Sequence, residues 1–573
     1  MRLPSLPGVR AIAGYQGSWL RRDAVAGIVL TTLLVPQGMA YAELAGLPAI
    51  TGLYTSILCL VGYALFGPSR ILVLGPDSSL GPMIAATILP ILGANGSPER
   101  AIALASMLAL LVGAVMIAAG VARLGFVADL LSKPTQIGYM NGLALTILVG
   151  QLPKLFGFST DADGLINEAR AFVNGLSSGE AVGAAIAIGA FSLLVILALG
   201  RWLPKLPGVL IAVVLAIAAT SVFNLADHGV SLVGTLPKGF PPLTFPHPVS
   251  DLPLLVAGAI GIALVALTDT ISTASAFAAR TGQEVNGNGE MVGIGVANVA
   301  AGFFQGFPAS TSASRTAVAE QAGAKTQITG LVGAAAIVLM LVFAPWLLQN
   351  LPQPVLAAIV IAAALSLADI PATVRLWRQR RVEFLLSITA FLGVALLGVI
   401  QGIALAVALS ILNVFRKVWW PYQTTLGRVP GLDGHHDRQQ HPDAEELPGL
   451  VIFRFDAPLL FANARTFRDQ IRRLAAASPR PLWIVIAAEP MTDIDTTAAD
   501  MLEDLNEELK ARGIFLVFAE LKDPVRKKLE RYELIGPLNP DHFFPTINAA
   551  VDTFCQETGA QWTPPKQSDP ETR

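Results

Sequence analysis

Apolar segments recur between residues 24 and 415, and this pattern limits the chain to a fold that crosses a membrane many times. A full helical crossing needs about 20 apolar residues, and several of these segments fall short of that length. The mean hydropathy of +0.59 also lies outside the range of soluble globular proteins. Fourteen segments can be counted, at 24–42, 50–66, 77–92, 101–120, 135–152, 181–200, 206–224, 252–278, 291–305, 311–323, 327–343, 354–370, 384–398 and 400–415.

Charged residues divide the chain near residue 420. Residues 1–420 hold 22 basic and 17 acidic side chains, whereas the much shorter remainder, 421–573, holds 17 basic and 24 acidic ones. A membrane-embedded domain is therefore followed by a soluble one. The expected parts are a cytoplasmic N-terminal segment, a transmembrane transport domain, a linker, a soluble domain and a disordered tail, at 1–23, 24–420, 421–448, 449–556 and 557–573.

Lysine and arginine are distributed unevenly over the loops. If the N-terminus is cytoplasmic and every segment crosses once, most basic residues fall on the cytoplasmic side, as the positive-inside rule requires. The N-terminus and the soluble domain are then both cytoplasmic, and the chain lies in the plasma or inner membrane. The first apolar span serves as an uncleaved anchor, because no cleavable signal peptide is visible. The outer loops hold only Arg100, Lys154, Arg170 and Lys238.

The third and tenth segments are unusually short and begin with glycine, proline and small polar residues. They read 75-GPDSSLGP-82 and 306-GFPASTSAS-314, and they occupy matching places if the fourteen segments are two inverted repeats of seven. Such interrupted segments at matching positions predict the binding site of an inverted-repeat transporter. The alternative is a pair of kinked helices that pack through small residues.

Arg315 follows the second of these interruptions, inside an apolar region. Two half-helices that start near the membrane midplane would aim free N–H groups and positive dipole ends at one place, which favours an anion. The guanidinium adds a permanent charge, and nearby hydroxyls can donate hydrogen bonds without adding charge. The alternative is that Arg315 pairs permanently with an internal acid. The hydroxyl candidates for substrate binding are Ser78, Thr311, Ser312 and Ser314.

Asp269 lies within a span that is otherwise free of charge, so it is the first candidate for coupling transport to H⁺ or Na⁺. Asp77 is a second candidate, for substrate or ion, although it could simply cap the half-helix that follows it. In the first segment Gln37 could bind substrate, Tyr41 could pack beside it, and Glu43 could face the interface between the repeats and couple to the ion. For Tyr41 and Glu43 plain packing is at least an equal alternative.

Three stretches of the chain resemble the sulfate permease family. They are 36-PQGMAYAELAGLPAITGLYTSI-57, 67-GPSR-70 with 75-GP-76, and 281-TGQEVNGNGEMVGIGVANVAAGFFQGFPASTSASRTAV-318. The resemblance implies two intertwined inverted repeats, a core domain that moves against a gate domain, and a homodimer. It also implies an anion between the third and tenth helices, with Asp269 in place of an acidic residue that is often Glu. By position, the residues lining the anion would be Gln37, Tyr41, Asp77, Ser314 and Arg315.

The soluble part alternates strand-like and helical stretches, which predicts a small α/β domain. Strands are expected at 450–461, 482–489 and 514–521, and a helix is expected to begin near Thr496. The domain resembles a STAS domain, with a regulatory partner, and 493-DIDTTAADML-502 matches the loop that can be phosphorylated in that family. Thr496 or Thr497 is the candidate, although Asp495 and Thr496 could merely cap the helix.

These patterns together predict a secondary-active transporter for a small anion of the sulfate, bicarbonate or dicarboxylate class. The expected mechanism is H⁺- or Na⁺-coupled symport by movement of the core against the gate. An uncoupled anion channel or an anion exchanger of the same fold is the alternative. No enzyme active site, cofactor, nucleic-acid surface or metal site is expected, apart from Na⁺ near Asp269 if Na⁺ is the coupling ion.

Overall fold

The chain forms two compact units, Met1–Ile411 and Leu412–Arg573. The computed structural model describes residues 8, 14–93, 96–126, 131–160, 162, 164–204, 206–245, 252–281 and 284–563.

Fourteen helices in the described residues correspond to the fourteen expected apolar segments. Seven helical stretches are both long and apolar enough to cross a membrane, and α4, α9 and α13 are apolar but shorter. The helices are α2 (Leu20–Leu44), α3 (Ala49–Phe66), α4 (Gly81–Leu92), α5 (Pro98–Val121), α6 (Lys133–Leu155), α8 (Gly183–Trp202), α9 (Gly208–Phe223), α10 (Leu252–Thr281), α11 (Gly287–Phe303), α12 (Ala313–Gln321), α13 (Ile328–Phe343), α14 (Gln353–Leu367), α16 (Arg381–Leu392) and α17 (Val399–Trp419).

Two repeats of seven helices can be followed along the chain, α2 to α9 and α10 to α17. A short amphipathic helix lies between the fifth and sixth members of each repeat, α7 (Leu165–Ser177) in the first and α15 (Ile370–Gln379) in the second. These two helices were not among the expected segments, because their polar faces keep them below the hydropathy of a membrane span. Their matching places support the internal repeat.

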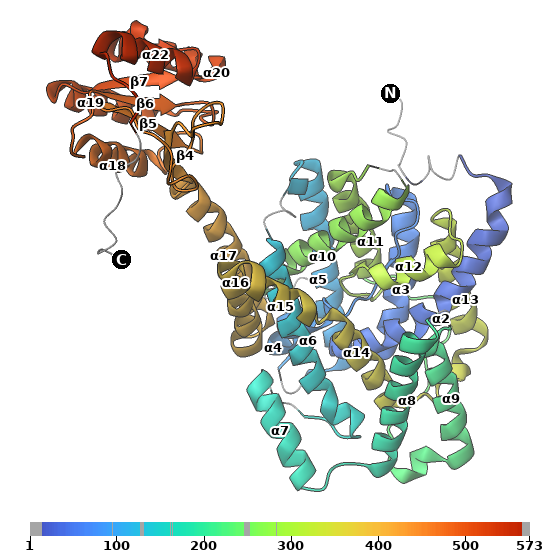
Figure 1. Ribbon diagram of the computed structural model, residues 1–573. Helices are drawn as coiled ribbons and strands as arrows, with labels where there is room; N and C mark the ends of the chain where they lie inside the picture. Colours follow the sequence, from blue (N-terminus) through green and yellow to red (C-terminus); the bar gives the residue numbers. More distant parts are fainter. Residues whose placement is uncertain are drawn as a thin grey trace. The chain divides into compact units, whose positions relative to one another are not determined.

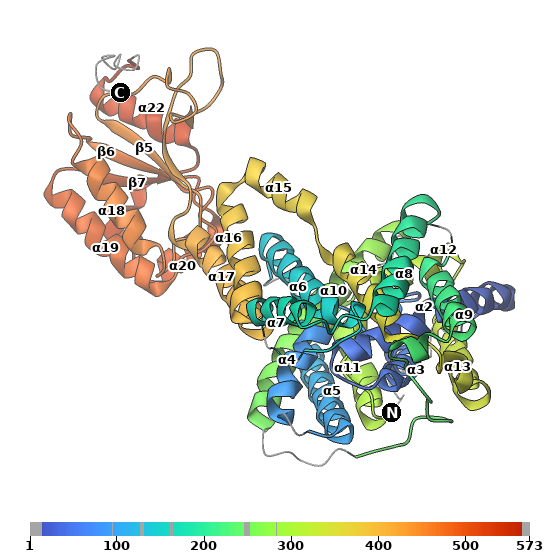
Figure 2. The same cartoon turned by 90° about the horizontal axis from the view of Figure 1, so that it is seen from below.

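The helices of the first unit pack in two groups, which correspond to the expected core and gate domains. Helices α3, α5, α10 and α11 pack together with α2 and α13, while α6, α8, α14 and α16 pack together (Figure 1, Figure 2). Small residues allow close approach within a group. A Cβ atom added to Gly113 of α5, for example, would lie 2.6 Å from the carbonyl oxygen of Gly295 on α11.

The second unit contains a six-stranded sheet in the order β4-β3-β5-β6-β7-β8. Strands β5 to β8 are parallel, and β3 pairs antiparallel with β5. Side chains of β6 alternate between two apolar layers: Ile484 and Ile486 pack with α18 and α19, and Val485 packs with α22. The elements are β3 (Gln423–Gly427), β4 (His436–Asp437), β5 (Leu450–Phe455), α18 (Ala464–Ala475), β6 (Trp483–Ala487), α19 (Thr496–Ala511), β7 (Phe515–Ala519), α20 (Asp523–Arg531), α21 (Ile535–Leu538), β8 (Phe543–Phe544) and α22 (Ile547–Thr558).

The stretch 421–448 differs from the expected linker, since it contributes β3 and β4 to the sheet. Its strand β3 pairs with β5, for example Thr425 with Phe453, and a polar composition does not reveal such a strand. The start of the expected disordered tail is also ordered: α22 ends at Thr558, and Thr563 forms a β-bridge with Glu446. Residues 564–573 lie outside the described residues.

Candidate functional site

The third and tenth segments both begin with extended backbone before their helices start. Strands β1 (Leu74–Gly75) and β2 (Ser310–Thr311) pair antiparallel, with Leu74 opposite Thr311 and Gly75 opposite Ser310. Helix α4 begins at Gly81 and helix α12 at Ala313. An antiparallel pair is the arrangement that an inverted repeat produces at its axis. It brings the starts of the two half-helices together.

Side chains of neighbouring helices satisfy the irregular backbone before β2. Asn298 of α11 bonds both polar groups of Ala309, donating to its oxygen over 3.1 Å and accepting from its N–H over 2.8 Å. Thr55 accepts from the N–H of Phe307, and Ser106 donates to the oxygen of Gly306. Non-helical backbone inside a membrane protein needs such partners. The interruption is therefore a built feature.

Arg315, in the first turn of α12, is fully buried. Its Nη2 donates to the carbonyl oxygen of Pro76 over 2.6 Å, next to the pairing of β1 with β2. Its Nε and Nη1 have no hydrogen-bond partner, and the guanidinium forms no ion pair with any described residue. Two of the three guanidinium nitrogens, Nε and Nη1, are thus free to donate hydrogen bonds inside a buried, positively charged site.

Asp77 and Asp269 meet at one hydroxyl, that of Ser79. The Ser79 oxygen lies 2.6 Å from Oδ2 of Asp77 and 3.0 Å from Oδ2 of Asp269, which is on α10. Asp77 also accepts from the Ser79 N–H over 3.0 Å, so it stabilises the turn before α4 without capping the helix itself, whose N-cap is Leu80. Ser78 was a candidate from the sequence and Ser79 was not, although a serine two residues after an aspartate is typical of such a turn.

The remaining hydroxyls lie around this place. Thr311 donates to Thr270 of α10 over 3.1 Å, and Thr270 is a second residue that the sequence analysis missed. The Ser312 and Ser314 oxygens are 3.1 Å apart, and Ser312 caps α12 by accepting from the Arg315 N–H. Thr311 and Ser312 are buried, whereas Ser314 is exposed at the helix start.

Of the candidates in α2, Tyr41 is closest to this cluster. It is buried, and its phenol interacts with Ser78 and lies in the electrostatic field of Asp77 and Arg315. Gln37 is half-buried and forms no side-chain hydrogen bond within the described part of the chain.

Glu43 lies in a different place, in a groove of about 500 Å³ that Lys154 of α6 and Gln353 of α14 also line. The Lys154 amine donates to the Glu43 carbonyl oxygen over 3.3 Å. The structure therefore places Glu43 where α2 meets helices of the other group, with a lysine as its neighbour.

Two other buried acids already have donors. Asp23 is fully buried and accepts from the N–H of Lys325 and from the hydroxyls of Thr326 and Thr329. Glu290, also fully buried, accepts from the hydroxyls of Tyr63 and Ser69. These contacts give both carboxylates a structural role.

Tyr139 of α6 was not a candidate, because a lone tyrosine in an apolar span carries no sequence signal. It is fully buried, its hydroxyl has no partner in the described residues, and it interacts electrostatically with Asp269 and Asp77. A helix of the second group therefore carries a buried hydroxyl, without a partner in the described residues, within electrostatic range of the acid pair.

The candidate phosphorylation loop of the second unit has a clear structural role. Asp495 caps α19 by accepting from the Ala498 N–H over 2.9 Å, which matches the capping alternative. Thr496 and Thr497 are exposed in the first turn of that helix. A hydrogen bond from Lys528 lowers the pKa of Asp493 in the same loop below its ordinary value.

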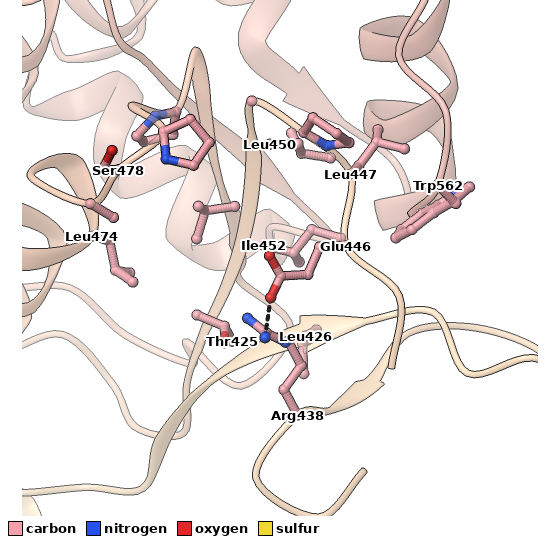
Figure 3. Close-up of a pocket in the computed structure, with 16 residues that line it drawn as sticks. Thr425, Leu426, Arg438, Glu446, Leu447, Leu450, Ile452, Leu474, Ser478 and Trp562 are labelled. Atoms are coloured by element: carbon pink, nitrogen blue, oxygen red, sulfur yellow. Dashed lines mark ion pairs between the residues drawn. The ribbon is translucent and has the colours of Figure 1, made fainter. Parts of the chain in front are cut away.

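A cavity of about 240 Å³ lies at the edge of the sheet where β5 begins. Figure 3 shows Arg438 and Glu446 joined by an ion pair in this cavity, with Trp562 to one side. These two charges neutralise each other, and leucine and proline side chains form much of the remaining wall. Unlike the place around Arg315, this cavity offers no free charge to a ligand.

Comparison with known proteins identifies both parts of the chain. The model of the sulfate permease family matches residues 20–390, and that of the STAS domain matches residues 441–550. The chain belongs to the sulfate permease family. It is accordingly a multi-pass membrane transporter with a STAS domain, and not an enzyme.

The similarity to individual members extends over nearly the whole chain. The protein named "Probable sulfate transporter MT1781" of Mycobacterium tuberculosis (strain CDC 1551 / Oshkosh) is 42% identical over 550 residues, which cover 96% of this chain and 98% of that protein. The solved structure of the murine Solute Carrier 26 family member A9 anion transporter covers 97% of this chain and 94% of its own, with a TM-score of 0.86 and 24% identity.

The transmembrane domain of a cyanobacterium bicarbonate transporter, BicA, matches with a TM-score of 0.60 and 22% identity. It covers 70% of this chain and 98% of its own chain. Both structures are less than 25% identical to this chain, so they establish its fold alone.

Proposed function

We propose that the chain is a secondary-active transporter of a small anion, which binds between β1–α4 and β2–α12. The observation that carries this proposal is Arg315: it is fully buried, paired with no described carboxylate, and left with two unpartnered donor nitrogens. A buried cation with free donors is costly unless a ligand completes it. The starts of two half-helices add N–H groups and dipole charge of the same sign.

Sulfate is the first substrate to test, since the 42% identical relative is named a sulfate transporter. The name of BicA supports bicarbonate as a second candidate, and a dicarboxylate presents the same oxyanion chemistry to Arg315. Gln37, Tyr41, Ser78, Thr311, Ser312 and Ser314 are the proposed polar lining beside Asp77 and Arg315.

The acid pair supports coupling to H⁺. The Ser79 hydroxyl carries one proton, yet its oxygen lies within hydrogen-bond distance of both Asp77 and Asp269. It can donate to only one carboxylate, so the other contact is satisfied only if that carboxyl group carries a proton itself. Na⁺ between the carboxylates is the competing proposal, and both ions would offset the charge of an incoming anion.

Arg315 is tested by uptake into proteoliposomes. Arg315→Ala is expected to abolish saturable uptake of labelled sulfate, bicarbonate and fumarate while the protein keeps its thermal transition. Arg100→Ala, which removes an exposed charge from the first turn of α5, is the matched control and should transport normally. Unchanged saturable uptake by the Arg315 variant would refute the assigned site.

Asp269 is tested with imposed pH and Na⁺ gradients. Asp269→Asn is expected to lose the dependence of uptake on the driving gradient. Glu290→Gln, at another fully buried acid, is expected to keep that dependence because hydroxyl donors already occupy both of its oxygens. A variant at Asp269 that still follows both gradients excludes it as the coupling acid, and conductance without concentrative uptake in the parent protein favours an anion channel.

The wider assembly stays part of the proposal. The N-terminus and the STAS domain are proposed to be cytoplasmic, in a plasma or inner membrane, and the transporter is proposed to be a homodimer. The STAS domain would then offer Thr496 or Thr497 to a cytoplasmic kinase or partner. Accessibility of single introduced cysteines to a membrane-impermeant reagent tests the orientation, and mass measurement in nanodiscs tests the dimer.

A further inference from the structure

The end of α17 has the features of a helix that leaves a membrane. Its last turn carries Arg416 and Lys417, and Trp419 and Trp420 follow, with exposed fractions of 39% and 68%. Basic and aromatic residues at the end of a membrane helix mark the level of the lipid headgroups. This end therefore lies at the membrane–water interface.

Two hydrogen bonds fasten α18 to this end of α17, within the second unit. The Asn463 amide donates to the carbonyl oxygen of Val418 over 3.1 Å, and the Thr466 hydroxyl donates to that of Trp419 over 3.1 Å. The last carbonyl groups of a helix lack partners within it, so these bonds also complete the end of α17. The start of α18 is therefore held within bonding distance of the interface.

Helix α18 brings a basic surface to this place. It carries four arginines and one acid, Asp469, which lies near Arg465 and Arg468 at 3.6 and 3.7 Å. Glu508 of α19 pairs with Arg472, while Arg473 is exposed and forms no ion pair with a described residue. Helix α18, with four arginines and one acid, itself keeps a net positive charge.

An apolar side chain is exposed beside these charges. Phe461, two residues before the bond from Asn463, has an exposed fraction of 68%. Its N–H donates to Asp495 over 2.7 Å, so its backbone is fixed although its ring is not packed. Exposed aromatic rings next to arginines are typical of surfaces that lie in the headgroup region.

We propose that this α17–α18 surface, made of Arg416, Lys417, Trp420, Phe461, Arg465 and Arg473, docks the STAS domain onto anionic phospholipids. A basic cluster directly beyond a membrane helix is attracted by anionic headgroups, and Trp420 and Phe461 add burial at the boundary with the acyl chains. Helix α18 is hydrogen-bonded to Val418 and Trp419, the last residues of a membrane helix. We therefore assign lipid as the partner that binds this surface. The proposal does not depend on which ion is transported.

The test uses the full chain in nanodiscs, in a Cys555→Ser background where Cys59 is buried. A fluorophore on Ala462→Cys leaves Phe461 in place, and lipids with a nitroxide on the headgroup report contact by quenching. We expect strong quenching in phosphatidylglycerol and loss of most of it in phosphatidylcholine or high salt. The double variant Arg465→Glu/Arg473→Glu should lose it while keeping the parent's thermal transition.

Residues for matched controls lie at the opposite end of the parallel strands. Because β5, β6 and β7 are parallel, Ala511 and Arg480 lie near their N-terminal ends, and Phe461 lies near their C-terminal ends. A label on Ala511→Cys should not be quenched, and Arg480→Glu should not change the signal at Ala462→Cys. Equal quenching in both lipids, or quenching that vanishes in discs holding a single copy, would overturn the proposal, the latter in favour of a second copy as the occupant.

Discussion

Gly75 offers a way to disturb Arg315 without removing it. A Cβ atom at Gly75 would lie 2.9 Å from Nη1 of Arg315, whereas ordinary contacts begin near 3.4 Å. In Gly75→Ala the guanidinium must therefore retreat by about 0.5 Å from the place where its unpartnered nitrogen lies. If an anion binds there, at least one charge-assisted hydrogen bond is lost or misaligned.

The size of the effect follows from that bond. A hydrogen bond to a charged group contributes about 1.5–3 kcal/mol, and each 1.4 kcal/mol changes an affinity about tenfold. The concentration of sulfate that gives half-maximal uptake should rise by about 10- to 150-fold in Gly75→Ala. The measurement is initial uptake into proteoliposomes over a range of sulfate concentrations, with protein content matched between preparations.

Gly93 supplies the matched control, because it also has a positive φ, +68° against +155° at Gly75, but no atom lies within 4 Å of an added Cβ. Gly93→Ala adds backbone strain of about 1–3 kcal/mol without touching the site, and it should keep the parent's half-maximal concentration. The same concentration in Gly75→Ala and the parent would refute the claim that the free side of Arg315 faces the anion.

Three further predictions follow from other contacts. Tyr139→Phe should not lower the melting temperature, because the hydroxyl it removes has no partner in the described residues. It should slow uptake severalfold, because that hydroxyl lies within electrostatic range of Asp269 and Asp77. A lower melting temperature with unchanged uptake would contradict this. Asn298→Ala should lower the free energy of unfolding by about 2–6 kcal/mol, since both polar groups of Ala309 lose their partner. The control is Asn350→Ala, at a half-buried residue whose amide donates to the Ser221 hydroxyl and to no backbone group of Ala309; both are measured by thermal unfolding in detergent. Burial lowers the pKa of His542, so the unfolded chain binds a proton on this residue at a higher pH than the folded chain does. The second unit should therefore be most stable above about pH 6.5, and its free energy of unfolding should fall as the pH falls. In His542→Gln the free energy of unfolding should depend less on pH.

Much of the first unit could be predicted because the bilayer imposes strong local rules. Each apolar segment must satisfy its own backbone, so the fourteen segments correspond to helices without knowledge of their neighbours. The same rule makes the glycines and prolines at 75–82 and 306–314 informative, since they interrupt segments that would otherwise be continuous. Arg315 attracted attention for a related reason: a charge in an apolar span is expensive and is kept for a purpose.

Contacts between distant segments could not be predicted in this way. Ser79 matters because α10 brings Asp269 to it from 190 positions away. Tyr139 matters because α6 holds it, fully buried, within electrostatic range of the same acids. The position of Glu43 also depended on packing: its place in the first segment made it a candidate for ion coupling, and the packed helices put it beside Lys154. In the STAS domain the polar stretch before β5 forms strand β3 only through pairing with Phe453 and its neighbours.

The sequence by itself determined which segments enter the membrane, where two of them break, and that a cation lies at one break. These properties follow from the free energy of transferring each segment into lipid, which depends on local composition. The tertiary structure decided which hydroxyls and carboxylates surround that cation, and that its charge is left without a described acidic partner. Those features depend on the packing of helices from two halves of the chain, which no local pattern encodes.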